Sequence, residues 1–166
     1  VTSSETTLTL NPVADSYVSS SNLTGNYGTQ TTMKVREGAG DSANPNYRTY
    51  LKFDVSGVGS SVTSLQLRLF VTDASSNVES VYVVSDNSWA ETTIKYSNAP
   101  AIDGTAIGTT KSAPAGAYVT ITLDPTAFPS GASTLTLALK SSATDSFIVS
   151  SREDPTNKPE LIVTSH

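Results

Sequence analysis

The chain has 166 residues, with ten Lys and Arg against 15 Asp and Glu, a formal net charge of −5 and no cysteine. Its length fits one domain with a core of its own. The lack of cysteine excludes disulfides, thiolate zinc sites and cysteine nucleophiles. The acidic balance argues against nucleic-acid binding, which needs a large excess of cations. No apolar run reaches the roughly 18 residues of a membrane span. We therefore expect neither a nucleic-acid nor a membrane partner.

The first seven residues, VTSSETT, are typical of a Ser/Thr linker. We interpret residues 1–7 as a linker remnant and expect residues 8–166 to form a single module of a larger multidomain protein. The chain is rich in Ser and Thr and only 15% of its residues are charged. So few charges are typical of strands whose exposed positions are occupied by Thr and Ser. This composition indicates a secreted or cell-surface protein.

Ten short β-rich runs follow one another along the chain, separated by clusters of Gly, Pro, Asn, Asp and Ser. They show no helical periodicity. This pattern predicts an all-β fold, a β-sandwich jelly roll of antiparallel strands. The expected strands are 7–10, 15–20, 33–37, 48–55, 64–72, 79–85, 118–124, 134–141, 146–151 and 160–165.

Three of these runs show which side of each strand faces the core. Apolar and polar residues alternate in them, and strand side chains alternate between the two faces of a sheet. The residues predicted to face inward are Leu65, Leu67, Leu69 and Val71 in the first run, Val119, Ile121 and Leu123 in the second, and Leu135, Leu137 and Leu139 in the third.

The same alternation predicts that several Lys and Arg side chains face away from the core. Met33 and Val35 predict that Lys34 and Arg36 share the opposite face. Because Leu51 and Phe53 point to the core, the neighbouring outward set is Arg48, Tyr50 and Lys52, and Arg68 faces outward on the next run.

Five of the ten cations thus lie outward on three strands. If these strands belong to one sheet, they form a basic platform that contains Tyr50. Cations two apart on a strand are about 6.5–7 Å apart and strands about 4.8 Å apart, which is comparable to the repeat of carboxylates along a polyuronate. Arginine supplies planar paired contacts and lysine a movable point charge.

A second interpretation of these cations remains open. Outward Lys and Arg on antiparallel strands also serve as ordinary solubilising and edge-protecting residues. Glu37, Asp41 and Asp54 are close in sequence and would neutralise part of such a face.

Several segments also carry a family resemblance. VADSYVSSSNLTGNYGTQTTMKVREG, YRTYLKFDVSG, VTSLQLRLFVT, DNSWAETTIKYSNAPA and FIVSSREDPTNKPELIVTS together resemble the DNRLRE domain, which overlaps carbohydrate-binding module family 96. The resemblance extends from about Leu8 to Thr164. It implies a β-jelly roll attached to secreted or surface polysaccharide-degrading enzymes or to adhesin-like proteins.

For its characterised branch, the resemblance implies alginate as the ligand, bound by Lys and Arg on a sheet surface. The basic positions in the matching strands are Lys34, Arg36, Arg48 and Lys52, with Arg68 and Arg152 nearby in the pattern. The orientation of Arg152 depends on which face of SFIVSS points inward, and the sequence leaves this open.

Carboxylates near strand ends and loops are candidate ligands of a structural Ca²⁺, together with backbone carbonyls. No EF-hand-like loop is present and spacing defines no ligand set, so the metal ligands stay unassigned and no cofactor is expected to be required. The alternative role for these carboxylates is turn capping. The candidates are Asp15, Asp54, Asp86, Glu91, Asp145, Glu153 and Asp154.

Trp89 is the sole tryptophan. In a binder of neutral sugars it would be the natural stacking platform. Its context, DNSWAETTIKY, favours packing under a loop as part of the core. The tyrosines able to stack on sugar rings are Tyr17, Tyr27, Tyr47, Tyr50 and Tyr96. Only Tyr50 shares the phase of the basic set.

Catalytic machinery is not indicated. The one histidine, His166, is the last residue, and no Ser/His/Asp set, metal cluster or phosphate loop can be assembled. We therefore expect no catalytic residue.

Our hypothesis is a non-catalytic module that binds an acidic polysaccharide, alginate first among candidates, and targets an attached polysaccharide-degrading enzyme. The predicted ligand-binding residues are Lys34, Arg36, Arg48, Tyr50, Lys52, Arg68 and Arg152. The alternatives are a structural or adhesive surface domain without a sugar ligand, and a neutral-glycan binder that uses Trp89 or tyrosines.

Overall fold

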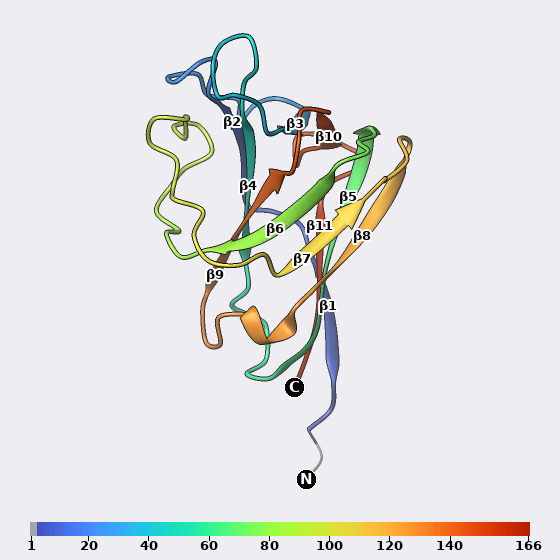
Figure 1. The fold of residues 1–166 in the computed structure, drawn as a ribbon. Helices are drawn as coiled ribbons and strands as arrows, with labels where there is room; N and C mark the ends of the chain where they lie inside the picture. The colour runs from blue at the N-terminus through green and yellow to red at the C-terminus, as the bar shows by residue number, and fades with distance from the viewer. Residues whose placement is uncertain (1–2) are drawn as a thin grey trace.

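The computed structural model describes residues 3–166, which form two antiparallel sheets packed face to face (Figure 1). The predicted all-β sandwich of antiparallel strands is confirmed. The six-stranded sheet contains β1 (Thr6–Leu10), β11 (Glu160–Ser165), β5 (Val62–Asp73), β10 (Phe147–Ser150) and β3 (Thr32–Val35), with β8 (Ala117–Leu123) also paired to β5. The five-stranded sheet contains β2 (Ala14–Ser19), β4 (Tyr47–Asp54), β9 (Thr134–Ser141), β6 (Val78–Val84) and β7 (Gly108–Lys111).

Consecutive strands from β3 to β6, and again from β8 to β10, change sheets at each step. This connection pattern is typical of jelly rolls. The strand that the sequence patterns missed is β7, because GTTK carries no apolar alternation. A short 3₁₀ helix, η1 (Pro125–Ala127), precedes β9. No helix in residues 3–166 has the length and apolar character needed to cross a membrane.

The first strand begins at Thr6, two residues before the module boundary expected at residue 8. Thr7 lies opposite Thr164 of β11 and their hydroxyls form a hydrogen bond of 2.9 Å. Of the expected linker, residues 1 and 2 lie outside the described residues.

The main core lies between the sheets and follows the predicted alternation. Each inward set packs there, because the apolar face of a half-buried strand must be covered by the opposing sheet. The predicted residues Leu65, Leu67, Leu69, Val71, Ile121, Leu123, Leu135, Leu137 and Leu139 are buried in this core, and Val119 packs against it partly buried.

A second apolar cluster lies on the outer face of the five-stranded sheet. Residues 85–107, here called the covering loop, connect β6 to β7 and pack on this face (Figure 1, yellow-green). The cluster consists of Trp89 and Ile94 from the loop with Ala14, Val18, Tyr50, Val84 and Ala138 from the strands. One half of this sheet is therefore not a solvent-facing surface.

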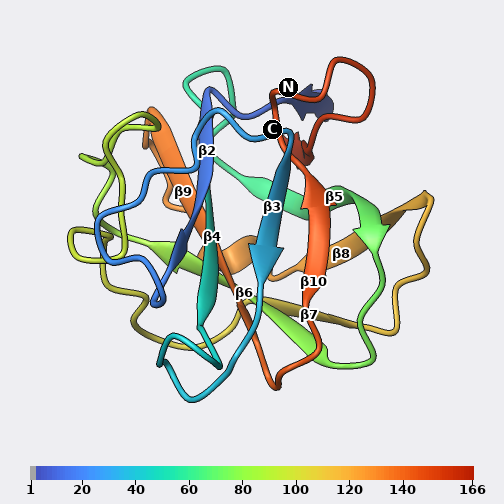
Figure 2. The same cartoon turned by 90° about the horizontal axis from the view of Figure 1, so that it is seen from above.

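The two sheets approach each other at an edge where β3 lies beside β4 (Figure 2). Arg36 and Tyr47 exchange backbone hydrogen bonds of 3.1 and 3.0 Å there. The Thr49 hydroxyl donates to the Lys34 carbonyl at 2.8 Å. Lys34 and Arg48 therefore belong to different sheets but lie close to the same corner of the sandwich.

A buried carboxyl on β6 makes stability depend on pH. Glu79 is 1% exposed, its Oε1 accepts a hydrogen bond from the Ser141 hydroxyl at 3.2 Å, and its Oε2 has no partner among the described residues. Burial raises the pKa of Glu79 from 4.5 to about 7, with the Asp145 charge adding to the rise against hydrogen bonds from Ser75 and Ser141.

We predict that Glu79→Gln becomes progressively more stable than wild type as the pH rises from 4.5 to above 7. Over this range the unfolded carboxyl loses its proton while the folded one retains it, so wild-type stability falls. The difference in the free energy of unfolding should grow by about 3 kcal/mol, as measured by urea unfolding at several pH values. A constant difference across this range would show that Glu79 is ionised in the folded protein.

Candidate functional site

The predicted cations do not lie on one sheet. β3 and β5, which carry Lys34 and Arg68, belong to the six-stranded sheet, whereas β4 with Arg48, Tyr50 and Lys52 belongs to the five-stranded sheet. The prediction that these cations form a basic platform on a single sheet is therefore wrong. Alternation correctly identified outward positions, but strand order along the chain did not reveal that the chain changes sheets between β3, β4 and β5.

Lys34 and Arg36 lie at the corner where β3 meets β4. The Lys34 ammonium is 5.5 Å from the ring centroid of Tyr47 and 5.8 Å from that of Tyr17, and cations over aromatic faces are attracted to them. The Arg36 Nε donates to the Thr144 carbonyl at 2.8 Å. Neither cation forms an ion pair within residues 3–166, so both charges are available at the surface.

Arg48 sits beside this corner with its side chain only 13% exposed. It forms an ion pair of 2.6 Å with Glu37 and donates to the Arg36 carbonyl at 3.1 Å. These contacts hold the guanidinium in one orientation. Glu37 is the more exposed partner at 37%.

Tyr50 and Lys52 attach the covering loop to the sheet. The Tyr50 side chain is buried, and its hydroxyl donates to the Pro100 carbonyl at 2.7 Å. Burial raises the pKa of Tyr50 to about 12. The Lys52 ammonium donates to the Trp89 carbonyl and lies 4.5 Å from the Trp89 ring centroid, and burial lowers the pKa of Lys52. The loop thus covers Tyr50 and engages Lys52.

Trp89 packs as predicted for a core residue. It is 7% exposed, and its indole N–H donates to the Thr136 hydroxyl at 3.1 Å. In this position the ring cannot stack on a sugar without displacement of the loop.

Arg68 lies on the other sheet. It pairs with Glu160 at 3.1 Å and stacks on Tyr118 with 4.4 Å between the guanidinium carbon and the ring centroid. Arg152 follows β10 and pairs with Glu91 at 3.1 Å and Glu153 at 3.4 Å. The structure therefore separates Arg68 and Arg152 from the corner that contains Lys34, Arg36 and Arg48.

Most of the candidate metal-binding carboxylates cap turns, the alternative role considered for them. Asp54 and Asp86 each accept from the backbone and hydroxyl of a serine two residues later, Ser56 and Ser88, and these bonds lower the pKa of both carboxyls. Asp145 accepts from Ser76, and Asp154 accepts from two backbone amides in its own turn.

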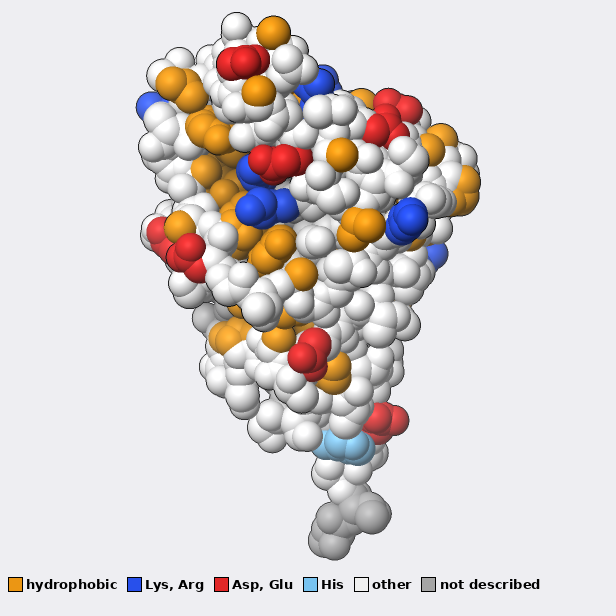
Figure 3. Space-filling view, in the orientation of Figure 1, with side chains coloured by type: hydrophobic (Ala, Val, Ile, Leu, Met, Phe, Trp, Pro, Cys, Tyr) orange, Lys and Arg blue, Asp and Glu red, His pale blue; other side chains and the backbone are white. Residues whose placement is uncertain are grey.

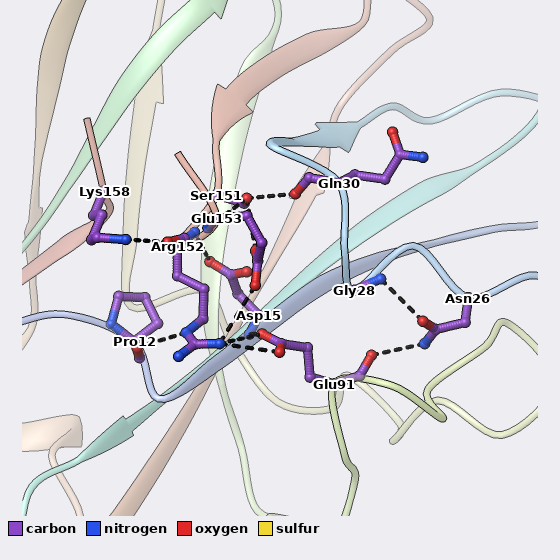
Figure 4. Close-up of polar contacts among 10 residues, drawn as sticks. All are labelled: Pro12, Asp15, Asn26, Gly28, Gln30, Glu91, Ser151, Arg152, Glu153 and Lys158. Carbon is purple, nitrogen blue, oxygen red and sulfur yellow. Dashed lines mark hydrogen bonds and ion pairs between the residues drawn. The ribbon is translucent and has the colours of Figure 1, made fainter. Parts of the chain in front are cut away.

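The remaining three, Asp15, Glu91 and Glu153, come together around Arg152 (Figure 4). Asp15 is the most buried of them. Burial raises the pKa of Asp15 to about 8, and the charges of Glu153 and Glu91 add to the rise against a hydrogen bond from the Arg152 backbone.

A pocket of about 210 Å³ lies between the covering loop and the outer face of the five-stranded sheet. Arg48 and Lys140 contribute the charge, and the loop contributes Tyr96, Ala99 and Ile102. In Figure 3, Lys and Arg side chains gather between hydrophobic and acidic ones on the half of the face next to this loop. The lining residues are Val18, Arg48, Tyr50, Tyr96, Ala99, Ile102 and Lys140.

Sequence reasoning missed Lys140 and named Tyr96 only as one of five tyrosines able to stack on a sugar ring. The signal for Lys140 was present, because Leu135, Leu137 and Leu139 face the core and the next position in TLTLALK therefore faces outward. Its ammonium lies 5.8 Å from the Tyr82 ring centroid, and it forms no ion pair within the described part of the chain. No pattern singled out Tyr96 among those tyrosines, because the loop that presents it has no periodicity.

The sequence model of carbohydrate-binding module family 96 matches residues 6–165, nearly the whole chain. The chain belongs to carbohydrate-binding module family 96. Such modules bind carbohydrate and are non-catalytic, in agreement with the lack of an assembled catalytic set in the sequence. No curated protein matches the chain. In this module the pocket beside the covering loop brings the paired Arg48 and the unpaired Lys140 together with Tyr96 of the loop.

The covering loop of the module depends on one close backbone approach. A Cβ added at Gly28 would lie 2.1 Å from the Glu91 carbonyl oxygen, far inside van der Waals contact. The Asn26 side chain fixes this segment by donating to the carbonyls of Glu91 and Ile94, both at 2.8 Å. The 21–31 segment and the covering loop are thus packed backbone to backbone.

We predict that Gly28→Ala destabilises the module by about 1–3 kcal/mol, because the added methyl must push the two backbones apart. Thermal unfolding followed by Trp89 fluorescence measures this effect directly. Gly57→Ala is the matched control, since a Cβ there meets only a Leu8 methyl at 3.8 Å. Equal stabilities of the two variants would contradict the packing described here.

Proposed function

We propose that the module binds an acidic polysaccharide, alginate, at the pocket formed by Arg48, Lys140 and the covering loop. The observation that carries this proposal is the presence of two cations from neighbouring strands, β4 and β9, in one pocket with the Tyr96 ring of the covering loop. A uronate ring has matching chemistry: a carboxylate on one side and a face of C–H groups on the other.

The two cations have complementary properties. The Arg48 guanidinium is held by Glu37 and the Arg36 carbonyl, and a pre-oriented guanidinium favours planar paired contacts with a carboxylate. The Lys140 ammonium is unpaired within the described chain and can adjust its position. Tyr96 and Ile102 offer apolar surface to the ring face.

The size of the pocket suggests how a polymer would be bound. About 210 Å³ is smaller than the roughly 300–1,000 Å³ of pockets for drug-sized ligands, so we expect one ring to be held there while the chain runs across the surface. Lys34 and Arg36, at the adjoining corner, are positioned to contact further carboxylates. Of the remaining predicted ligand residues, Tyr50 lines the pocket with its hydroxyl engaged by the Pro100 carbonyl. Lys52, Arg68 and Arg152 have structural partners instead.

The biological setting follows as part of the proposal. A non-catalytic sugar-binding module serves by holding an attached polysaccharide-degrading enzyme close to its substrate, which raises the effective concentration of the substrate. We therefore propose that the module belongs to a larger secreted or cell-surface protein.

A structural or adhesive domain without a sugar ligand is the second candidate. The closed ion pair between Arg48 and Glu37 favours it, because a guanidinium already neutralised by a carboxylate attracts a uronate less strongly. Unlike Glu37, Asp54 pairs with no cation among the described residues and caps its own turn.

We predict that Lys140→Ala and Arg48→Gln each weaken alginate binding about tenfold or more, because a hydrogen bond to a charged group contributes about 1.5–3 kcal/mol. Isothermal titration calorimetry with alginate oligomers at about 50 mM and 500 mM NaCl gives the affinity and its salt dependence. Arg68→Gln removes the same charge from the other sheet and should change the affinity less than twofold. Loss of binding in the Arg68 variant alone would move the site to the six-stranded sheet.

Glu37→Gln should have the opposite effect and tighten alginate binding by about two- to fivefold. The substitution removes the carboxylate that competes with the ligand for Arg48, and partly exposed ion pairs of this kind are worth about 0.2–1 kcal/mol. The same titration at low salt measures the gain. Weaker binding by this variant would show that Glu37 orients Arg48 more than it competes for it.

A further inference from the structure

Three carboxylates from separate parts of the chain point toward one another on the flank of the covering loop (Figure 4). Asp15 comes from β2, Glu91 from the covering loop and Glu153 from the turn after β10. One oxygen of each lies within 4.8 Å of the others. Neighbouring carboxylates repel, so this arrangement holds either a proton on one carboxyl or a compensating positive charge.

Arg152 supplies only part of that charge. Its guanidinium contacts Glu91 at 3.1 and 3.2 Å and Glu153 at 3.4 Å, and it is the only cation within ion-pair distance of the three among the described residues. The Lys158 ammonium donates to the Arg152 carbonyl instead of reaching a carboxylate. Ionised, the cluster carries two negative charges in excess.

The oxygen atoms of Asp15 provide an independent observation. The side chain is 1% exposed, and its Oδ2 accepts from the Arg152 backbone N–H at 2.8 Å. Its Oδ1 is buried and has no hydrogen-bond partner among the described residues. Buried carboxylate oxygens are rarely left without a donor or a metal, because the free energy lost with their hydration is then not compensated by any contact.

We propose that Asp15, Glu91 and Glu153 bind a hard divalent cation, calcium, with Asp15 Oδ1 as the innermost ligand. Calcium accepts six to eight oxygen ligands in irregular geometry and favours carboxylates. Glu91 and Glu153 are only half-buried, so water can complete the coordination. Magnesium is the poorer match, because it requires near-ideal octahedral geometry.

The ion has a structural consequence for the sugar pocket. It joins β2, the covering loop and the turn after β10, three segments far apart in sequence. Because the covering loop also forms the pocket wall through Tyr96 and Ile102, calcium binding holds that wall against the sheet.

The test uses the module stripped with EDTA and titrated with CaCl₂ by calorimetry, with thermal unfolding in parallel. We expect one calcium per chain and a rise in Tm of about 5–10 °C when calcium exceeds its Kd by about 100-fold. No polysaccharide is present, so failure of alginate binding has no bearing on the result. Absence of binding heat and of a Tm shift with calcium, magnesium and manganese would overturn the proposal.

Two variants locate the ion. Asp15→Asn should abolish the calcium-induced Tm shift without lowering the Tm of the metal-free protein, since the amide keeps the shape of the side chain but cannot become a carboxylate ligand. Glu153→Gln should weaken calcium binding at least tenfold. This variant provides the test of the site if Asp15→Asn folds poorly. Asp103→Asn, an exposed position on the same loop, is the control and should bind calcium like wild type. Calcium binding at full strength by both cluster variants would place the ion elsewhere and overturn the assignment.

Discussion

The packing of Trp89 and Ile94 against Tyr50 is the interaction on which the rest of the site depends. It places the covering loop on the outer face of the five-stranded sheet, which would otherwise expose apolar side chains to water. Trp89 also satisfies its indole N–H on Thr136, and Lys52 closes over its ring. Without this contact there is no pocket wall, and Arg48 and Lys140 would lie on an open sheet.

The cations around the pocket are only partly paired with carboxylates, although the chain is acidic as a whole. Arg48 has a carboxylate partner in Glu37, whereas Lys34 and Lys140 have aromatic neighbours and no ion pair within residues 3–166. A ligand with regularly spaced carboxylates meets one guanidinium already in orientation and ammonium groups that remain free. Recognition then depends on where the individual cations lie relative to the carboxylates of the ligand, and not on the net charge of the chain.

Alternation of apolar residues predicted the strands and their inward faces, because the side-chain period of a strand is two and one face must be buried. The same rule placed Arg48 and Lys34 outward correctly. It could not assign strands to sheets, since that depends on pairing between residues far apart in the chain, such as Thr49 with Leu139. It also could not show that the covering loop buries Tyr50, because the contact of its hydroxyl with Pro100 has no periodic signal.

The family resemblance in the sequence was confirmed over nearly the whole length of the chain, and it indicated carbohydrate binding before the pocket was known. It did not indicate which cations are free, since partners such as Glu160 for Arg68 are brought close only by the fold. The pairing state of each cation, rather than its presence in a motif, separates Lys140 from Arg68 as a candidate ligand residue.

The most direct measurement is a two-dimensional ¹⁵N–¹H NMR titration of the module with an alginate hexamer. The account predicts that amide shifts concentrate around Arg48, Lys140 and Tyr96 and fade toward Arg68 and Tyr118 on the other sheet. Shifts centred on the six-stranded sheet, or none at a ligand concentration that saturates binding, would contradict it.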